Sequence, residues 1–327
     1  MIGLPQPPCP YIRGLLYMQE MVLLLRINRH IQAWDFGVLV PLLARLPLFW
    51  GRGLAQARGV VCAVLDYDWR STAINARYVR SRVFTMMRQL SIRTPVRKTV
   101  QRFINNSLEE WQSCLFRHPK KMDRIARKCH IDHLETYQRL AGKNQGIVMV
   151  AHHFDSFCMG MVLMGMKNLK VHCINTRGIE DPRIDPEIRS YFQTKYRCME
   201  RWMNGKMPYY EDGMQIFYDK LQQGEMVVLM GDVPGRKSGV KIDFMGKKFR
   251  LPLGAWHMAT KTDSLLGAYV TLGFSGGRYC TVCIPPYSPD PYDPEGSLMP
   301  IYEFLESWTR ACPEKWVASD LLQAYES

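Results

Sequence analysis

Short apolar runs alternate with longer amphipathic stretches from residue 146 onward. The apolar runs predict strands over residues 147–150, 171–174, 226–230, 240–244, 266–271 and 279–284. The stretches between and after them predict helices over residues 157–166, 186–202, 213–222, 254–262 and 302–309, and the Pro-rich residues 285–300 predict a surface loop. This alternation indicates an α/β fold with a mixed, mostly parallel central sheet flanked by helices.

The residues before position 140 have a helical pattern, with a long basic helix expected over residues 73–90. No apolar run reaches the roughly 18–20 residues that a membrane-spanning helix needs, and no signal peptide is expected. Residues 39–50 instead combine Leu, Phe and Trp with Arg45, which is typical of an amphipathic helix lying in a membrane interface. The alternative is that this helix only packs on the core. We expect a membrane-associated helical segment over residues 1–68 and an α/β domain over residues 69–327.

The first candidate site follows the strand at 147–150, where the sequence reads A-H-H-F-D-S-F. His152 and His153 lie between a strand end and a helix start, the place where α/β proteins usually carry their chemistry. One of the two histidines is expected to be structural, because adjacent side chains on a strand point in different directions. Asp155 is either a catalytic carboxylate or simply the N-cap of the following helix.

The second candidate site follows the strand at 226–230, where Asp232 holds the equivalent position at a strand end. Arg236 and Lys237 come just after it, and a turn aspartate in an ion pair is the plainer interpretation. Arg177 and Arg183 follow the strand at 171–174. We expect these four cations, with His152, to bind a phosphorylated substrate.

The chain has 327 residues and a formal net charge of +13, with a sequence pI of about 9.3. Residues 69–128 contain fifteen Lys or Arg and three acids, which indicates an anionic partner: lipid headgroups, an acidic carrier protein or a phosphorylated substrate. Nucleic-acid binding would rest on charge alone, and no recognisable binding module supports it, so no nucleic-acid partner is expected. The ten cysteines lack a disulfide framework. Cys280 and Cys283 are expected on opposite faces of a strand, so neither a metal nor a cofactor is expected.

Together these blocks resemble the late acyltransferases of lipid A biosynthesis, the lauroyl/myristoyl acyltransferase family. The similarity covers residues 31–286 and includes G-I-V-M-V-A-H-H-F-D-S-F, then N-T-R and a basic helix, then L-Q-Q-G-E-M-V-V-L-M-G-D-V-P-G, and finally K-I-D-F-M-G-K-K-F-R-L-P-L-G. It implies a glycerolipid acyltransferase-like fold on the cytoplasmic face of the bacterial inner membrane. The implied reaction moves a fatty acyl chain from acyl carrier protein or acyl-CoA to a hydroxyl of a glycolipid, with a histidine as general base.

The chain departs from the family motif, which is a histidine, four residues, then Asp or Glu. Counting from His153, the acid position holds Cys158. Asp155 replaces the acid, Asp232 supplies it from the second block, or the site serves a different acyl or aminoacyl donor or has lost activity. We favour Asp155 on proximity. The competing hypothesis is a non-catalytic, membrane-associated homologue.

Overall fold

The computed structural model describes residues 29–69, 79–232 and 239–320. Its centre is a six-stranded sheet with the order β1-β8-β7-β2-β4-β3. The strands are β1 (His130–Ile131), β2 (Ile147–Asp155), β3 (Val171–Cys173), β4 (Met226–Met230), β7 (Leu265–Gly273) and β8 (Tyr279–Cys283). Four of the five strand pairs are parallel and only β7–β8 is antiparallel. The expected mixed, mostly parallel sheet is therefore confirmed.

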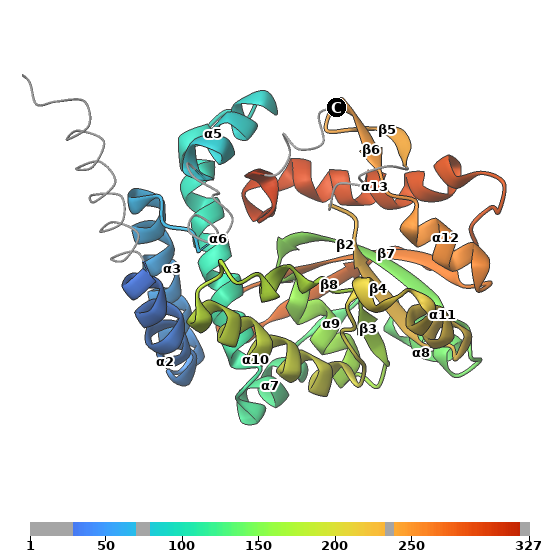
Figure 1. The fold of residues 1–327 in the computed structure, drawn as a ribbon, viewed down its shortest axis with the longest axis horizontal. Coiled ribbons are helices and arrows are strands. Elements are labelled where there is room, and N and C mark those ends of the chain that lie inside the picture. The colour runs from blue at the N-terminus through green and yellow to red at the C-terminus, as the bar shows by residue number, and fades with distance from the viewer. Residues whose placement is uncertain (1–28, 70–78, 233–238, 321–327) are drawn as a thin grey trace, which may run out of the picture.

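Helices cover both faces of this sheet (Figure 1). One face carries α8 (Leu134–Ala141), α9 (Phe157–Met166) and α10 (Pro186–Met203), and the other carries α11 (Gln215–Gln222), α12 (Gly254–Lys261) and α13 (Pro294–Ala311). A separate antiparallel hairpin pairs β5 (Val240–Phe244) with β6 (Lys247–Leu251). The sequence prediction missed β1 and β6. It was also wrong about the loop at 285–300, because α13 begins at Pro294 and holds Pro300 inside it.

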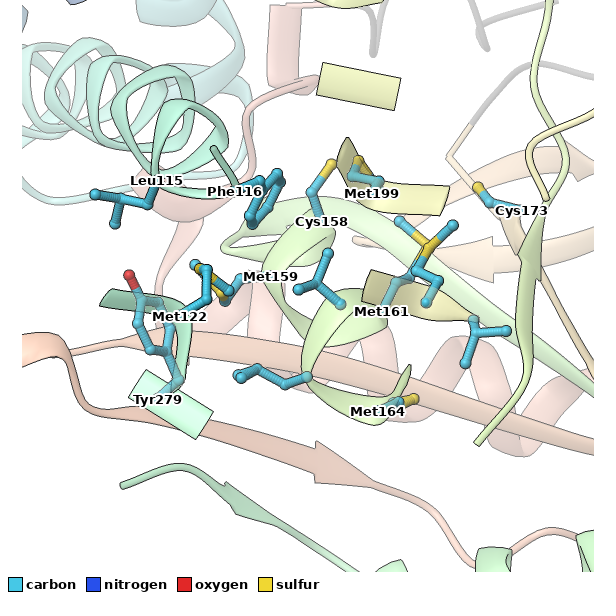
Figure 2. Packing of buried hydrophobic residues seen from close by; sticks show 14 of the residues in the cluster. Leu115, Phe116, Met122, Cys158, Met159, Met161, Met164, Cys173, Met199 and Tyr279 are labelled. Carbon is cyan, nitrogen blue, oxygen red and sulfur yellow. The ribbon is translucent and has the colours of Figure 1, made fainter. Parts of the chain in front are cut away.

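The methionine-rich helix α9 is a core element. Its side chains from Cys158 to Met164 are all buried, and Figure 2 shows Met159, Met161 and Met164 pointing in different directions from one helix into their neighbours. A helix that is apolar on all sides must be surrounded by protein. Gly160 lets it approach the sheet, since a Cβ there would lie 2.2 Å from the hydroxyl oxygen of Thr271. The helix is therefore a rigid support for whatever precedes it in the chain.

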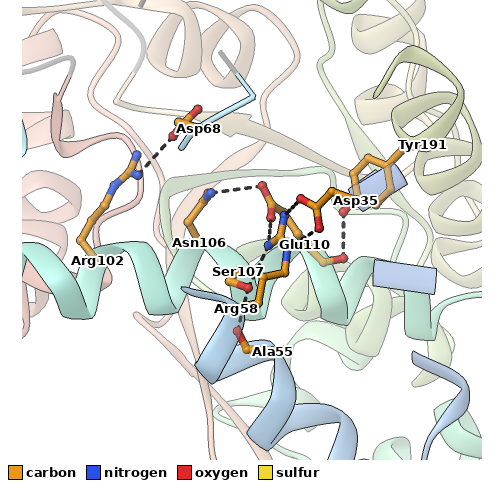
Figure 3. A network of polar contacts seen from close by, with 9 residues as sticks. All are labelled: Asp35, Ala55, Arg58, Asp68, Arg102, Asn106, Ser107, Glu110 and Tyr191. Atoms are coloured by element: carbon orange, nitrogen blue, oxygen red, sulfur yellow. Dashed lines mark hydrogen bonds and ion pairs between the residues drawn. The ribbon is translucent and has the colours of Figure 1, made fainter. Parts of the chain in front are cut away.

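The N-terminal helices α2 (Val40–Arg45) and α3 (Leu48–Leu65) pack on the long helix α6 (Pro95–Leu115), beside the π-helical turn η1 (Asp35–Leu39). Figure 3 shows the polar network that joins them. The buried Arg58 guanidinium donates to Asp35 at 2.8 Å, to Ser107 at 2.8 Å and to Glu110 at 2.6 Å. Helix α5 (Val79–Gln89) and the short α7 (Pro119–Ala126) flank α6. The expected basic helix at 73–90 lies partly outside the described residues. The division at residue 68 stays a prediction.

Candidate active site

The site is built at the carboxyl end of β2. Side chains alternate along this strand, so Ile147, Met149 and Ala151 join the core under α9 while Val148 and Val150 join the core under α13. The alternation continues into the two histidines and sends them to opposite faces. His153 lies on the α9 face, with its ring edge-on to Phe157 at 4.9 Å between centroids. His152 lies on the other face, which confirms that the two rings point in different directions.

His153 is paired with Asp232. The carboxylate accepts from the His153 backbone N–H at 2.8 Å and lies 2.8 Å from the ring nitrogen Nδ1. The two residues meet because β2 and β4 are parallel neighbours, and the Gly231 N–H extends their pairing by donating to the Ala151 carbonyl at 2.7 Å. The Asp232 side chain is 1% exposed and that of His153 is 32% exposed. The pair therefore has a buried anion behind an accessible imidazole.

The surroundings set the charge states of this pair. Burial by itself lowers the pKa of His153, but the charge of Asp232 and the hydrogen bond to it outweigh burial, so the pKa lies above its ordinary value. Burial raises the pKa of Asp232, but His153 and the Trp316 indole N–H outweigh it and hold that pKa well below its ordinary range. Asp232 is thus a fixed anion. Because a carboxylate only accepts, Nδ1 donates and Nε2 of the neutral ring is left to accept a proton.

His152 is enclosed by neighbouring side chains. It is 2% exposed, and within the part of the chain that the structure describes neither of its ring nitrogens has a hydrogen-bond partner. Its ring stacks on Trp316 at 6.2 Å and 24°, with Phe244 and Tyr302 around it. Burial lowers the pKa of His152 to about 4, so it stays neutral at physiological pH. Of the two histidines, His153 is the one that combines a partly exposed ring with a carboxylate partner.

The hydrogen bonds of the Asp155 carboxylate go to residues other than His153, which corrects our preference for it as the partner. It is the last residue of β2, with a left-handed φ of 47°. Its carboxylate binds the Lys315 ammonium and accepts from Ser156 Oγ at 2.8 Å and the Gly273 N–H at 3.3 Å. Nor is Asp155 the N-cap of α9, because Ser156 holds that position. Asp155 therefore holds the end of β2 in place and pairs with Lys315.

Cys158, at the family's usual acid position, lies in a second buried polar group. Burial raises the pKa of its thiol above the ordinary range, although the neighbouring Lys195 ammonium acts against this. Lys195 is itself paired with Glu109 of α6 at 2.7 Å and lies 5.5 Å from the Phe157 ring centroid. An ion pair between α6 and α10 therefore occupies the space beneath Phe157, close to where an acid at 158 would point.

The cations predicted to bind substrate are placed unevenly. Arg177 is exposed, ion-paired with Glu180 and Asp212, and lies over the Tyr209 ring. Arg183 is exposed and paired with Asp181. The structure thus shows these two arginines bound to their own acids. Arg236 and Lys237 lie outside the described residues, so their role stays a prediction.

The sequence analysis missed Trp316, which follows the short turn η5 (Pro313–Lys315). Its indole N–H donates to Asp232 at 2.8 Å. A lone tryptophan far from both histidine and aspartate in the chain gives no local signal. The part of the chain that the structure describes contains no helix long and apolar enough to cross a membrane. In those same residues, no cluster of three His, Cys, Asp or Glu side chains could hold a metal ion.

A cavity of about 450 Å³ lies at the amino ends of β2 and β4, the opposite edge of the sheet from His153. Glu225, Lys170 and Tyr137 are among its lining residues. Both Glu225 and Tyr137 are already hydrogen-bonded, to His172 and to the Ile284 carbonyl. The volume of this cavity therefore does not make it a stronger candidate for the active site than the surroundings of His153.

Comparison with known proteins agrees with the resemblance seen in the sequence. No curated protein matches the chain. The model of the bacterial lipid A biosynthesis acyltransferase family matches residues 28–318, which include every element from η1 to η5 and the His153–Asp232–Trp316 group. The chain belongs to the bacterial lipid A biosynthesis acyltransferase family.

Proposed function

We propose that this chain transfers a fatty acyl group from an acyl thioester to a hydroxyl of a lipid A-like glycolipid, with His153 as general base. The observation that carries the proposal is the pairing of a partly exposed imidazole with a buried carboxylate, His153 with Asp232. This arrangement leaves Nε2 of His153 as the proton acceptor. The family match supports acyl transfer as the reaction class.

The proposed reaction has two proton transfers. Nε2 takes the proton of the acceptor hydroxyl while its oxygen attacks the thioester carbonyl, and Asp232 stabilises the imidazolium that forms. The tetrahedral intermediate then collapses by breaking the carbon–sulfur bond. The thiolate leaves and takes the proton back from Nε2, which restores the neutral ring.

An oxyanion site is available beside the histidine. Helix α9 begins at Phe157, whose ring touches His153, and the side chain of its N-cap residue Ser156 makes no capping hydrogen bond. The first N–H groups of a helix have no partner within the helix and carry partial positive charge. We propose that these N–H groups bind the tetrahedral oxyanion.

The non-catalytic alternative was motivated by Cys158 at the acid position. The carboxylate of Asp232 supplies His153 with an anionic partner from the neighbouring strand, so that motive no longer applies. Turnover of an acyl thioester by the purified protein would exclude the alternative directly.

We propose acyl carrier protein as the donor, because the corner between α5 and α6 is strongly basic. Between residues 79 and 108 the chain has seven Lys or Arg and no acid. Arg88, Arg93 and Arg97 are exposed there, and Asn105, further along α6, donates to the Glu314 carbonyl beside the site. An acidic protein binds such a surface by charge complementarity.

Arg93→Glu/Arg97→Glu is expected to raise KM for the acyl carrier protein at least tenfold at low salt, against unchanged KM in an Arg197→Glu control. Equal KM values would favour a different donor or docking surface.

We also propose that the apolar surface of α2 and α3 rests on the inner-membrane surface, at its cytoplasmic face. Leu42, Phe49, Trp50 and Leu65 are 49%, 71%, 64% and 69% exposed, whereas Leu43 is in the core. Exposed Trp and Phe beside basic residues are typical of interfacial helices. Phe49→Ser/Trp50→Ser is expected to reduce sedimentation with phosphatidylglycerol-containing vesicles severalfold, relative to an exposed Tyr292→Ser control. Equal sedimentation would contradict this placement.

The proposed function is tested by mass spectrometry of lipid extracts from cells expressing the chain or its His153→Ala variant. The exposed His130, 70% exposed in its side chain, provides the matched control as His130→Ala. An acyl-sized mass difference on a glycolipid that His153→Ala alone abolishes would support both the reaction and the acceptor class. Full acyl transfer by His153→Ala would refute the general-base role.

A further inference from the structure

The segment that follows α13 lies along the end of β2 beside His153. The Val317 N–H donates to the His153 carbonyl at 2.7 Å, and Phe154 forms an antiparallel bridge with Trp316. Lys315 of this segment also forms an ion pair with Asp155, two residues after His153. The backbone that carries the imidazole is therefore held by residues about 160 positions later in the chain.

Trp316 completes the hydrogen bonding of the Asp232 carboxylate. One oxygen, Oδ1, faces the His153 ring, and the other, Oδ2, accepts from both the His153 backbone and the Trp316 indole, each at 2.8 Å. Trp316 and Asp232 are 1% and 3% exposed, so water does not replace this donor. Two donors on Oδ2 fix the plane of the carboxylate, and that plane determines whether Oδ1 meets Nδ1–H in line.

The position of the indole is itself fixed from α6. The Arg102 guanidinium, which is fully buried, donates to the Val317 carbonyl at 3.1 Å and pairs with Asp320. Asn105 donates to the Glu314 carbonyl at 2.9 Å. These contacts hold the residues on both sides of Trp316 against one rigid helix. The indole N–H is therefore set in place before substrate binds.

The Trp316 indole also contacts His152, whose neutral ring stacks on it. In the described residues His152 makes no hydrogen bond to Asp232, so the carboxylate orients a single imidazole, that of His153. Tyr302 lies in the same aromatic cluster, and its hydroxyl is directed to the Gly231 carbonyl at 3.4 Å. Within this cluster, Trp316 is the ring that donates to Asp232.

We propose that Trp316 is a positioning residue for the His153–Asp232 pair, acting through its indole N–H. This inference rests on the proposed function, in which His153 is the general base. Trp316→Phe keeps an aromatic ring in the cluster and deletes only the donor. Tyr302→Phe is the matched control, because it deletes a hydroxyl from the same cluster without touching Asp232.

For Trp316→Phe we expect kcat to fall ten- to a hundredfold with KM within twofold of wild type. The pKa of His153, followed by NMR of 13C-labelled histidine and assigned with His153→Gln, should rise, because a carboxylate without this donor attracts the imidazolium more strongly. The acidic limb of the pH–rate profile should move to higher pH with it. Tyr302→Phe should leave all three measurements unchanged.

An unmoved His153 pKa with wild-type kcat in Trp316→Phe would overturn the inference, and so would equal effects in Tyr302→Phe. The NMR titration separates this failure from failure of the proposed function. If His153→Ala keeps full activity, the general-base role fails. If His153→Ala is inactive while Trp316→Phe matches wild type in both titration and turnover, only the role of Trp316 fails.

Discussion

The choice between two carboxylates makes Asp232→Asn the decisive perturbation. Asp232 accepts from the His153 backbone, the His153 ring and the Trp316 indole, whereas Asp155 is held by Lys315, Ser156 and Gly273. An asparagine at 232 keeps one oxygen acceptor and turns an NH2 group toward donors. The imidazolium that forms during the reaction then has no anion beside it.

We expect Asp232→Asn to lower kcat by about 10²–10⁴-fold, as removal of the orienting carboxylate does in other histidine–acid pairs. That loss corresponds to about 3–5 kcal/mol of transition-state stabilisation. The buried donors left without an acceptor should also destabilise the fold by about 1–3 kcal/mol. Asp155→Asn is the control, with turnover expected within severalfold of wild type at a pH where both variants are folded.

The pH dependence of the rate provides a second, independent test of the assignment of Asp232 as the partner of His153. Asp232 holds the pKa of His153 above its ordinary value, and only the neutral ring acts as a base, so the wild-type rate falls as pH drops through that raised pKa. Removing the anion lowers this pKa. The acidic limb of kcat/KM should therefore move to lower pH in Asp232→Asn, although the maximal rate falls.

The assay is release of free thiol from an acyl thioester, measured with purified protein in detergent across the pH range. Thermal unfolding of each variant checks that the fold survives. If Asp232→Asn kept its rate and its limb while Asp155→Asn lost activity, the geometric assignment would be wrong and the sequence-based preference for Asp155 would be right.

Two further predictions concern stability. Arg58→Met leaves two buried carboxylates without their guanidinium and should lower the free energy of unfolding, measured with denaturant, by about 3–5 kcal/mol. Arg310→Met is the control, because it breaks an exposed pair within one helix and should lower that free energy by less than about 1 kcal/mol. Similar losses in the two variants would contradict the network of Figure 3. The pKa of His152 is about 4 in the folded protein against an ordinary value of 6.5, so the unfolded chain binds more protons and stability falls as pH drops below 6.5. Between pH 7 and pH 5 the wild type should lose about 2 kcal/mol more free energy of unfolding than His152→Phe, and parallel curves would show that this ring is not buried unpaired.

Much of the fold could be predicted from the sequence, because buried parallel strands leave continuous apolar runs. Helix α9 begins and ends where the pattern placed it, at Phe157 and Met166. The start of α13 was missed because Pro294 and Gly296 resemble loop residues. In the structure Asp293 caps the helix by accepting from the Gly296 N–H at 2.8 Å, with proline at the first helical position, where no N–H is needed.

The site was only half predictable. His153 and Asp232 were found by one rule, that polar residues after buried strands line a site. Their pairing depends on β4 lying next to β2, although β3 comes between them in the chain. The apolar patterns of these strands do not encode that order. Asp155 was preferred because it is near in sequence, but the left-handed turn at 155 directs its carboxylate to Lys315.

The family's acid position can now be given a physical account. Cys158 lies five residues after His153, in the first turn of α9, where its thiol is close to Lys195, and Lys195 is already paired with Glu109. An aspartate at 158 would bring a second buried carboxylate to that one ammonium. Its nearest cation would then be Lys195, and Nδ1 of His153 would still face position 232.

Introducing the missing acid should therefore fail to restore activity. Cys158→Asp in the Asp232→Asn background is expected to turn over no faster than Asp232→Asn alone, and thermal unfolding should show a loss of stability from the second buried carboxylate. Cys158→Ser is the control for polarity without charge. Recovery of even a tenth of wild-type turnover in the double variant would mean that an acid at 158 reaches His153. In that case the buried Glu109–Lys195 pair would not be what excludes it.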